Sequence, residues 1–215
     1  MRTGTHAQRG LSLVEVAFVI ATVVLVGVIF LPGMNRGHKR SPRISCMSNL
    51  KQIGLAYRIY SNDHGDQFPF AVSNEFGGTL SLTNSPQLFR HFEAISNELV
   101  TPKVLVCMAD RARVRAGDFQ TPLSNSNISY FVGLDAKEDQ PQSILSGDRN
   151  ITGGKLANGF LRLIRTNDSV GWTKDLHNLA GNIGLGDGST MQVNSLTLAR
   201  QVQAQPLPMI RLAIP

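Results

Sequence analysis

The sequence contains little cysteine, no long run of like charges and no signature of a familiar catalytic centre. Its 215 residues include two cysteines, Cys46 and Cys107, which are too few for a disulfide framework or a four-cysteine zinc site. The two cysteines are each other's only partners, so one disulfide can form if the protein lies in an oxidising compartment. Two buried thiols are the alternative.

The positive charge is spread along the chain rather than concentrated. The formal net charge is +6, but no block of five or six like charges occurs, which argues against a nucleic-acid partner. The densest basic stretch, RGHKRSPR at 36–43, directly follows an apolar segment. Basic residues in this position are typical of a segment that borders a membrane surface.

Motifs that would carry catalysis are absent from the sequence. G-x-S-x-G and H-E-x-x-H do not occur, and TGGK at 152–155 lacks the first glycine and the final serine or threonine of a P-loop. His177 and Asp187 suggest a metal site or an acid–base pair. The sequence has no third ligand or nucleophile at a spacing typical of such a site. We favour a structural role in which His177 braces the turn at 186–188 by hydrogen bonding. The sequence therefore predicts no catalytic residue, metal or cofactor, and no enzyme.

The loop SNDHGDQ at 61–67 holds two carboxylates, Asp63 and Asp66. Calcium binds to carboxylate and carbonyl oxygens, so the loop invites a calcium interpretation. The loop lacks the alternating ligands and the closing glutamate of an EF-hand, so a solvated turn is the favoured interpretation.

A long apolar segment lies near the N-terminus. Residues Leu11 to Leu31 number 21, close to the roughly 20 residues that cross a bilayer as a helix. A secretory signal would have a shorter apolar region followed by small residues, whereas PGMNRG follows here. The segment predicts a transmembrane helix, in which the carboxylate of Glu15 is costly unless it has a partner.

The residues around that carboxylate resemble the processing site of type IV prepilins and pseudopilins. The order GLSLVE at 10–15 implies cleavage by a prepilin peptidase between Gly10 and Leu11, followed by N-methylation of Leu11. In this family the glutamate pairs with the charged N-terminus of a neighbouring subunit during filament assembly, which would assign that role to Glu15. Pro32 would stand at mature position 22, where these helices often carry a kinking proline.

The remaining sequence predicts an α+β head with an antiparallel sheet, because a helix comes first and strands follow. Apolar residues at Met47, Leu50, Ile53, Tyr57 and Tyr60 predict a helix that ends near Gly65. A second short helix is expected after Ser85 and Pro86, and a last one at 196–203, capped by Asn194 or Ser195. Strands are expected at 103–107, 128–134, 143–146 and 160–164, with a hairpin in NIGLGDGSTMQV at 182–193.

A second resemblance covers most of the head. His177 is followed by nine residues and then Asp187 and Gly188, which is similar to the H-X9-DG signature of a group of prepilin-like proteins of planctomycetes and verrucomicrobia. Those proteins also carry a segment like CMSNLKQIGLAYRIY at 46–60 and a P-x-x-x-x-C segment like PKVLVC at 102–107. The resemblance names the motif without assigning it a chemistry.

Together these features predict a leader at 1–10, a transmembrane and filament-core helix at 11–35, its continuation at 36–64 and a globular head at 65–215. The predicted function is a pilin-like subunit of a type IV pilus or a type II secretion pseudopilus. Its expected partners are the prepilin peptidase, other pilin subunits and the inner membrane, with the head in the periplasm or at the cell surface. The alternative is a membrane-anchored binding protein that uses the signal only for delivery. An anchored hydrolase is the least favoured hypothesis.

Overall fold

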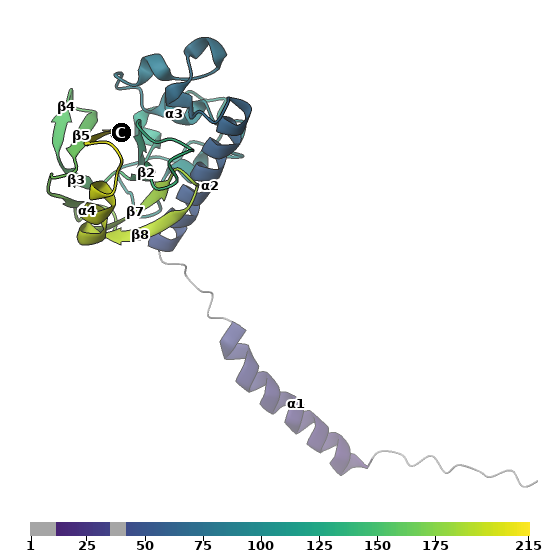
Figure 1. Ribbon diagram of the computed structural model, residues 1–215. Helices are drawn as coiled ribbons and strands as arrows, with labels where there is room; N and C mark the ends of the chain where they lie inside the picture. The colour runs from purple at the N-terminus through teal and green to yellow at the C-terminus, as the bar shows by residue number, and fades with distance from the viewer. Residues whose placement is uncertain (1–11, 35–41) are drawn as a thin grey trace, which may run out of the picture. The chain divides into compact units, whose positions relative to one another are not determined.

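The structure, a computed structural model, describes residues 12–34 and 42–215. The chain divides into two compact units, residues 1–40 and residues 41–215. The first contains one described helix and the second contains the sheet with its covering helices (Figure 1).

The first unit contains helix α1, Leu13–Met34. Its first turn is closed by a reciprocal pair of hydrogen bonds, because the Ser12 N–H donates to Glu15 Oε2 at 2.8 Å and the Glu15 N–H donates to Ser12 Oγ at 3.3 Å. This is the capping-box arrangement of Ser-x-x-Glu. Apolar side chains along the helix are exposed, among them Leu13, Phe18 and Val23. Within the described residues no helix has the length and apolar character of a membrane span, in contrast to the transmembrane segment expected at 11–35.

The second unit begins with helix α2, Pro42–Asp63, which packs along the sheet (Figure 1). Four of the five residues of the predicted stripe, all except Met47, are buried in its core. The helix ends as predicted, two residues before Gly65, whose φ of +65° breaks helical geometry at no steric cost. Helix α2 belongs to the same compact unit as the sheet, residues 41–215.

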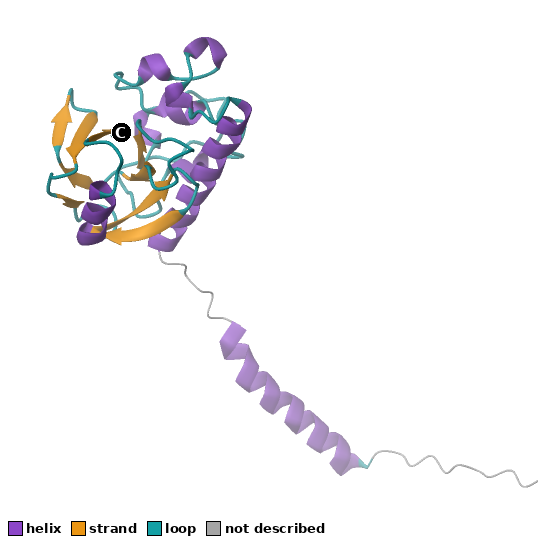
Figure 2. Ribbon diagram, viewed as in Figure 1, coloured by secondary structure: helices purple, strands orange, loops and turns teal. Residues whose placement is uncertain are grey.

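Seven strands form one sheet in which every pairing is antiparallel, and two more form a separate ribbon (Figure 2). The order in the large sheet is β4 (Lys155–Ala157), β5 (Leu161–Arg165), β9 (Met209–Ala213), β1 (Tyr130–Gly133), β2 (Ile144–Asp148), β7 (Ala180–Leu185) and β8 (Thr190–Asn194). The ribbon pairs β3 (Ile151–Gly153) with β6 (Val170–Trp172). The predicted α+β class is confirmed.

The sheet separates two apolar cores, because alternate residues of a strand point to opposite faces. Tyr130 and Val132 lie in the core under α2, whereas Phe131 between them lies in the core on the other face. That second core is covered by helix α4, Ser195–Gln203, which packs on β6 and β8. The cap of α4 is the predicted one, since Asn194 accepts a hydrogen bond from the Thr197 N–H at 2.8 Å.

Short helices cover the far end of α2. The α-helical turn predicted after Pro86 is confined to α3, Phe89–Glu93, although Leu88, Phe92, Ile95 and Leu99 are buried as expected. Five 3₁₀ turns complete this region: η1 (Pro69–Ala71), η2 (Asn74–Phe76), η3 (Leu80–Leu82), η4 (Pro102–Leu105) and η5 (Asn125–Asn127).

Two secondary-structure predictions were wrong. The segment 103–107 is not a strand, because Thr101 caps the 3₁₀ turn η4 and Pro102 supplies a fixed φ at its first position. No strand was expected after the last helix, but these residues include β9, which lies between β5 and β1 in the sheet. The predicted hairpin at 182–193 is confirmed as β7–β8.

Candidate functional site

A row of polar side chains lies on the face of the sheet that α2 covers. Tyr130 of β1 pairs with Asp148 of β2. Gly147, the residue before Asp148, pairs with Ile183 of β7, the residue after Asn182. All three polar residues of the row, Tyr130, Asp148 and Asn182, are fully buried. Buried polar groups are costly without partners, so the contacts of this row define the site.

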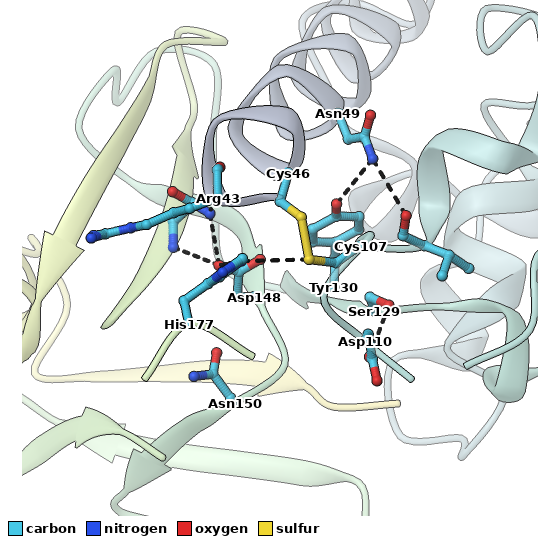
Figure 3. The surroundings of a disulfide bond; sticks show 12 residues. Arg43, Cys46, Asn49, Cys107, Asp110, Ser129, Tyr130, Asp148, Asn150 and His177 are labelled. Atoms are coloured by element: carbon cyan, nitrogen blue, oxygen red, sulfur yellow. Dashed lines mark hydrogen bonds and ion pairs between the residues drawn. A yellow bond between two sulfur atoms is a disulfide. The ribbon is translucent and has the colours of Figure 1, made fainter. Parts of the chain in front are cut away.

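The two cysteines form a disulfide above this row (Figure 3). Cys46 comes from the second turn of α2 and Cys107 follows the 3₁₀ turn η4, with a Cα–Cα distance of 5.2 Å. Asn49, one turn further along α2, donates from Nδ2 to the Val106 carbonyl at 3.4 Å and to the Tyr130 hydroxyl at 3.3 Å. The start of α2 is thus tied to the segment of Cys107 by one covalent bond and one side-chain amide.

His177 lies beside both the disulfide and Asp148, as Figure 3 shows. Its Nε2 is 3.4 Å from Cys107 Sγ and 3.4 Å from Asp148 Oδ2. The residue comes from the loop between β6 and β7, where Asn178 and Leu179 have positive φ angles that turn the chain into β7. The predicted role of His177 as a brace for the turn at 186–188 was wrong, because the polar contacts of its ring are with Cys107 and Asp148.

Asp148 is the most constrained carboxylate of the site. Its Oδ2 accepts hydrogen bonds from the backbone N–H of Asn182 at 2.7 Å and from its Nδ2 at 2.9 Å, while Oδ1 is buried without a partner among the described residues. Burial raises the pKa of Asp148 to about 7, although the hydrogen bonds from Asn182 and the nearby charge of Arg43 act to lower it. Asn182 therefore fixes the position of the Asp148 carboxylate, but the neighbouring groups stabilise its negative charge only in part.

The contact between His177 and Asp148 is a polar contact rather than a firm ion pair. Burial lowers the pKa of His177, and the positive charge of Arg43 lowers it further. Burial has the opposite effect on the pKa of Asp148. Both directions favour the uncharged form, which is the expected result of excluding water from two ionisable groups.

The Asp-Gly end of the H-X9-DG segment lies at the turn between β7 and β8. Gly188 has a φ of +77°, and Asp187 accepts a hydrogen bond from the Ser189 N–H at 2.8 Å. A Cβ on Gly54 of α2 would come within 3.3 Å of the Gly188 Cα, so helix and turn are in close contact through two glycines. Arg58 adds to this contact by donating from Nη1 to the Asp187 carbonyl at 3.0 Å.

A largely buried ion pair between Arg149 and Asp110 lies beside the site. Arg149 donates to both oxygens of Asp110, from Nε at 2.6 Å and from Nη2 at 2.8 Å, and Ser129 donates to the same carboxylate at 2.9 Å. Burial alone would raise the pKa of Asp110, but the hydrogen bonds from Arg149 and Ser129 outweigh it and lower the pKa. Both carboxylate oxygens of Asp110 therefore have hydrogen-bond partners within the chain.

The N-terminal predictions fall partly outside what the structure describes. Gly10 and Leu11, the predicted cleavage and methylation positions, lie outside the described residues. Glu15 lies in the first turn of α1 and forms the capping box. The backbone of Pro32 belongs to α1, which ends two residues later. Asp63 and Asp66 are exposed at the end of α2.

Comparison of the chain with known proteins gives no match to a family model, a curated protein or a solved structure. The resemblance to prepilins therefore depends on the sequence segments themselves. The structure brings those segments together, since 46–60, 102–107 and 177–188 all contribute to the contacts around the disulfide and along α2.

Sequence reasoning missed the residues that complete the site. Asp148 and Asn182 stand in strands with no motif around them, and only the sheet register places them beside His177. Both thiols are joined in the disulfide, so neither is a free nucleophile. The chemistry available here is that of sulfur, imidazole and carboxylate groups close to one another and shielded from water.

Proposed function

We propose that the protein is a pilin-like structural subunit, processed by a prepilin peptidase and assembled through its N-terminal helix into a type IV pilus or a secretion pseudopilus. The observation that carries this proposal is α1, a helix of 22 residues whose described apolar side chains are exposed. Phe18 is 71% exposed and Val23 is 66% exposed. Apolar surface of this extent requires a covering partner, and the equivalent helices of other subunits would supply it.

The head is compatible with this role. A helix packed along an antiparallel sheet presents a rigid unit, and the disulfide is consistent with an oxidising compartment outside the cytoplasm. The inner-membrane location before assembly stays a prediction from the sequence.

Glu15 has two candidate roles, and they make different demands on its side chain. The capping box requires an acceptor at this position and is served by glutamine as well as by glutamate. An ion pair with the N-terminus of a neighbouring subunit requires the negative charge. Glu15→Gln therefore keeps the first role and removes the second, whereas Ser12→Ala removes one bond of the cap and keeps the charge.

The test is to express the full chain with its prepilin peptidase, sequence the N-terminus and measure filament assembly. We expect a new terminus at Leu11, assembly of the Ser12→Ala variant and loss of assembly for Glu15→Gln and Glu15→Ala. A chain that still begins at Met1 in the presence of the peptidase would refute the processing step. Normal filaments from Glu15→Gln would refute the charge-pairing role and leave Glu15 as a cap. A processed chain that stays unassembled in the envelope would point to an anchored binding protein instead.

A further inference from the structure

Four metal-binding side chains lie around one point of the head. In the described part of the chain, one group of three ligand atoms lies within 4.8 Å of one another: Cys46 Sγ, Cys107 Sγ and His177 Nε2. Asp148 Oδ2 lies 3.4 Å from the same Nε2. Bond lengths of about 2.3 Å to sulfur and about 2.0–2.1 Å to nitrogen or oxygen place the ligand atoms of tetrahedral zinc roughly 3.2–3.8 Å apart. The two distances from His177 Nε2, 3.4 Å to Cys107 Sγ and 3.4 Å to Asp148 Oδ2, lie in this range. The two sulfur atoms are bonded to each other in the disulfide and must separate before both can bind a metal.

The state of Asp148 is an independent indication of a missing positive partner. The side chain is fully buried, and its Oδ1 has no hydrogen-bond partner within the described residues. Leaving such an oxygen unpaired costs free energy that a metal ligand would recover. Asn182 already orients the carboxylate through two hydrogen bonds to Oδ2, as the outer-shell residues of metal sites do.

The charges around the position would balance when a divalent ion is bound. Two thiolates and the Asp148 carboxylate contribute three negative charges, against two from the ion and one from Arg43. Arg43 is anchored beside the site, where its Nη2 donates to the carbonyls of Gly181 and Val193 at 3.3 Å each. A buried cluster is tolerated when its charges are compensated in this way.

We propose that the reduced head binds one Zn²⁺ through Cys46, Cys107, His177 and Asp148, and that the metal and the disulfide are alternative states of this position. Thiolate and imidazole ligands favour zinc over calcium or magnesium. The proposal is independent of filament assembly, since it concerns the head alone.

The two states are connected by balanced steps. Binding of Zn²⁺ forms two metal–sulfur bonds and releases the proton of each thiol. In the oxidising direction, the disulfide of a second molecule accepts two electrons by thiol–disulfide exchange, takes up two protons from water and becomes a dithiol. The sulfur–sulfur bond between Cys46 and Cys107 then forms, and the ion leaves.

The test uses the full chain in mild detergent, prepared both oxidised and fully reduced under anaerobic conditions. Zinc content is measured after incubation with Zn²⁺ alone, and binding of Co²⁺ is followed by its absorption, which reports thiolate ligands and tetrahedral geometry. We expect one bound ion per reduced chain and none per oxidised chain. Circular dichroism of each sample shows whether the head is folded.

Variants identify the ligands. His177→Ala should weaken binding at least about tenfold, and the double substitution Cys46→Ser with Cys107→Ser should abolish it. His64→Ala is the matched control, since His64 stacks on Tyr60 away from the site, and this variant should bind as the natural chain does.

Two results would overturn the proposal. One is a folded, reduced chain that takes up no zinc, and the other is binding that survives unchanged in both ligand variants. If the reduced chain is unfolded without metal, added Zn²⁺ must restore the spectrum of the folded head, and failure to do so would also overturn it.

Discussion

Removing the disulfide should cost the head about 4 kcal/mol of stability. Cys46 and Cys107 are 61 residues apart in the chain, and the chain-entropy relation for a loop of this length gives about 4 kcal/mol at 25 °C. Replacing both residues by alanine removes this constraint from the unfolded chain. At a urea m-value of about 2 kcal/mol/M, the unfolding midpoint should fall by about 2 M.

The assay is urea unfolding of the head, residues 41–215, followed by circular dichroism. Reduced natural protein, kept with a metal chelator, is the matched control because it retains both sulfur atoms and lacks only the cross-link. The m-value should rise in both samples, since an unfolded chain without the link exposes more surface. If both samples lose less than about 1 kcal/mol, the entropic reasoning is refuted. If only the alanine pair loses stability, packing of the sulfur atoms rather than the cross-link is responsible.

Three further substitutions test other parts of the head. Gly188→Ala should destabilise it by about 1 kcal/mol more than Gly159→Ala, because the two glycines have nearly equal positive φ angles but only a Cβ at 188 meets neighbouring atoms within 4 Å. Burial lowers the pKa of His91 to about 4, so the unfolded chain takes up its proton first and stability should fall by up to about 3 kcal/mol from pH 6.5 to 4. His91→Asn should flatten this loss in pH-dependent urea unfolding. Arg149→Ala should cost about 3 kcal/mol by leaving the carboxylate of Asp110 buried and unpaired.

Each of these substitutions has an internal comparison. Equal losses at the two glycines would show that contact with α2 contributes nothing at 188. An unchanged pH profile in the His91 variant would assign the acid sensitivity to another group. For the ion pair, Arg90→Ala is the control, since Arg90 pairs with Glu93 on the surface and should contribute below about 1 kcal/mol.

The sequence predicted the elements whose signals are local. The apolar stripe of α2, the Asn194 cap of α4 and the Gly-Asp-Gly turn of the β7–β8 hairpin each depend on neighbouring residues, and the structure has all three. Strand β9 was missed because Pro206 and Pro208 precede it and its place in the sheet depends on two distant strands. Local patterns carry no information about such pairings.

The candidate site could be predicted only in part for the same reason. Cys46, Cys107 and His177 were recognisable because they belong to motifs or are rare residue types. Asp148 became part of the site through strand register, which aligns residues separated by long loops. The role assigned to His177 was wrong because its neighbour along the chain, the turn at 186–188, is separated from it in space by the length of β7.

That separation explains why nine residues lie between the histidine and the Asp-Gly pair. The six residues of β7 extend roughly 20 Å at about 3.3 Å per residue. One end of this span contacts the disulfide through His177, and the other contacts α2 through Gly188 and Gly54. Gly54 lies eight residues after Cys46, about two helical turns further along α2. The nine residues are accounted for by strand β7 and the contacts that flank it at both ends, so the motif needs no catalytic function to explain its length.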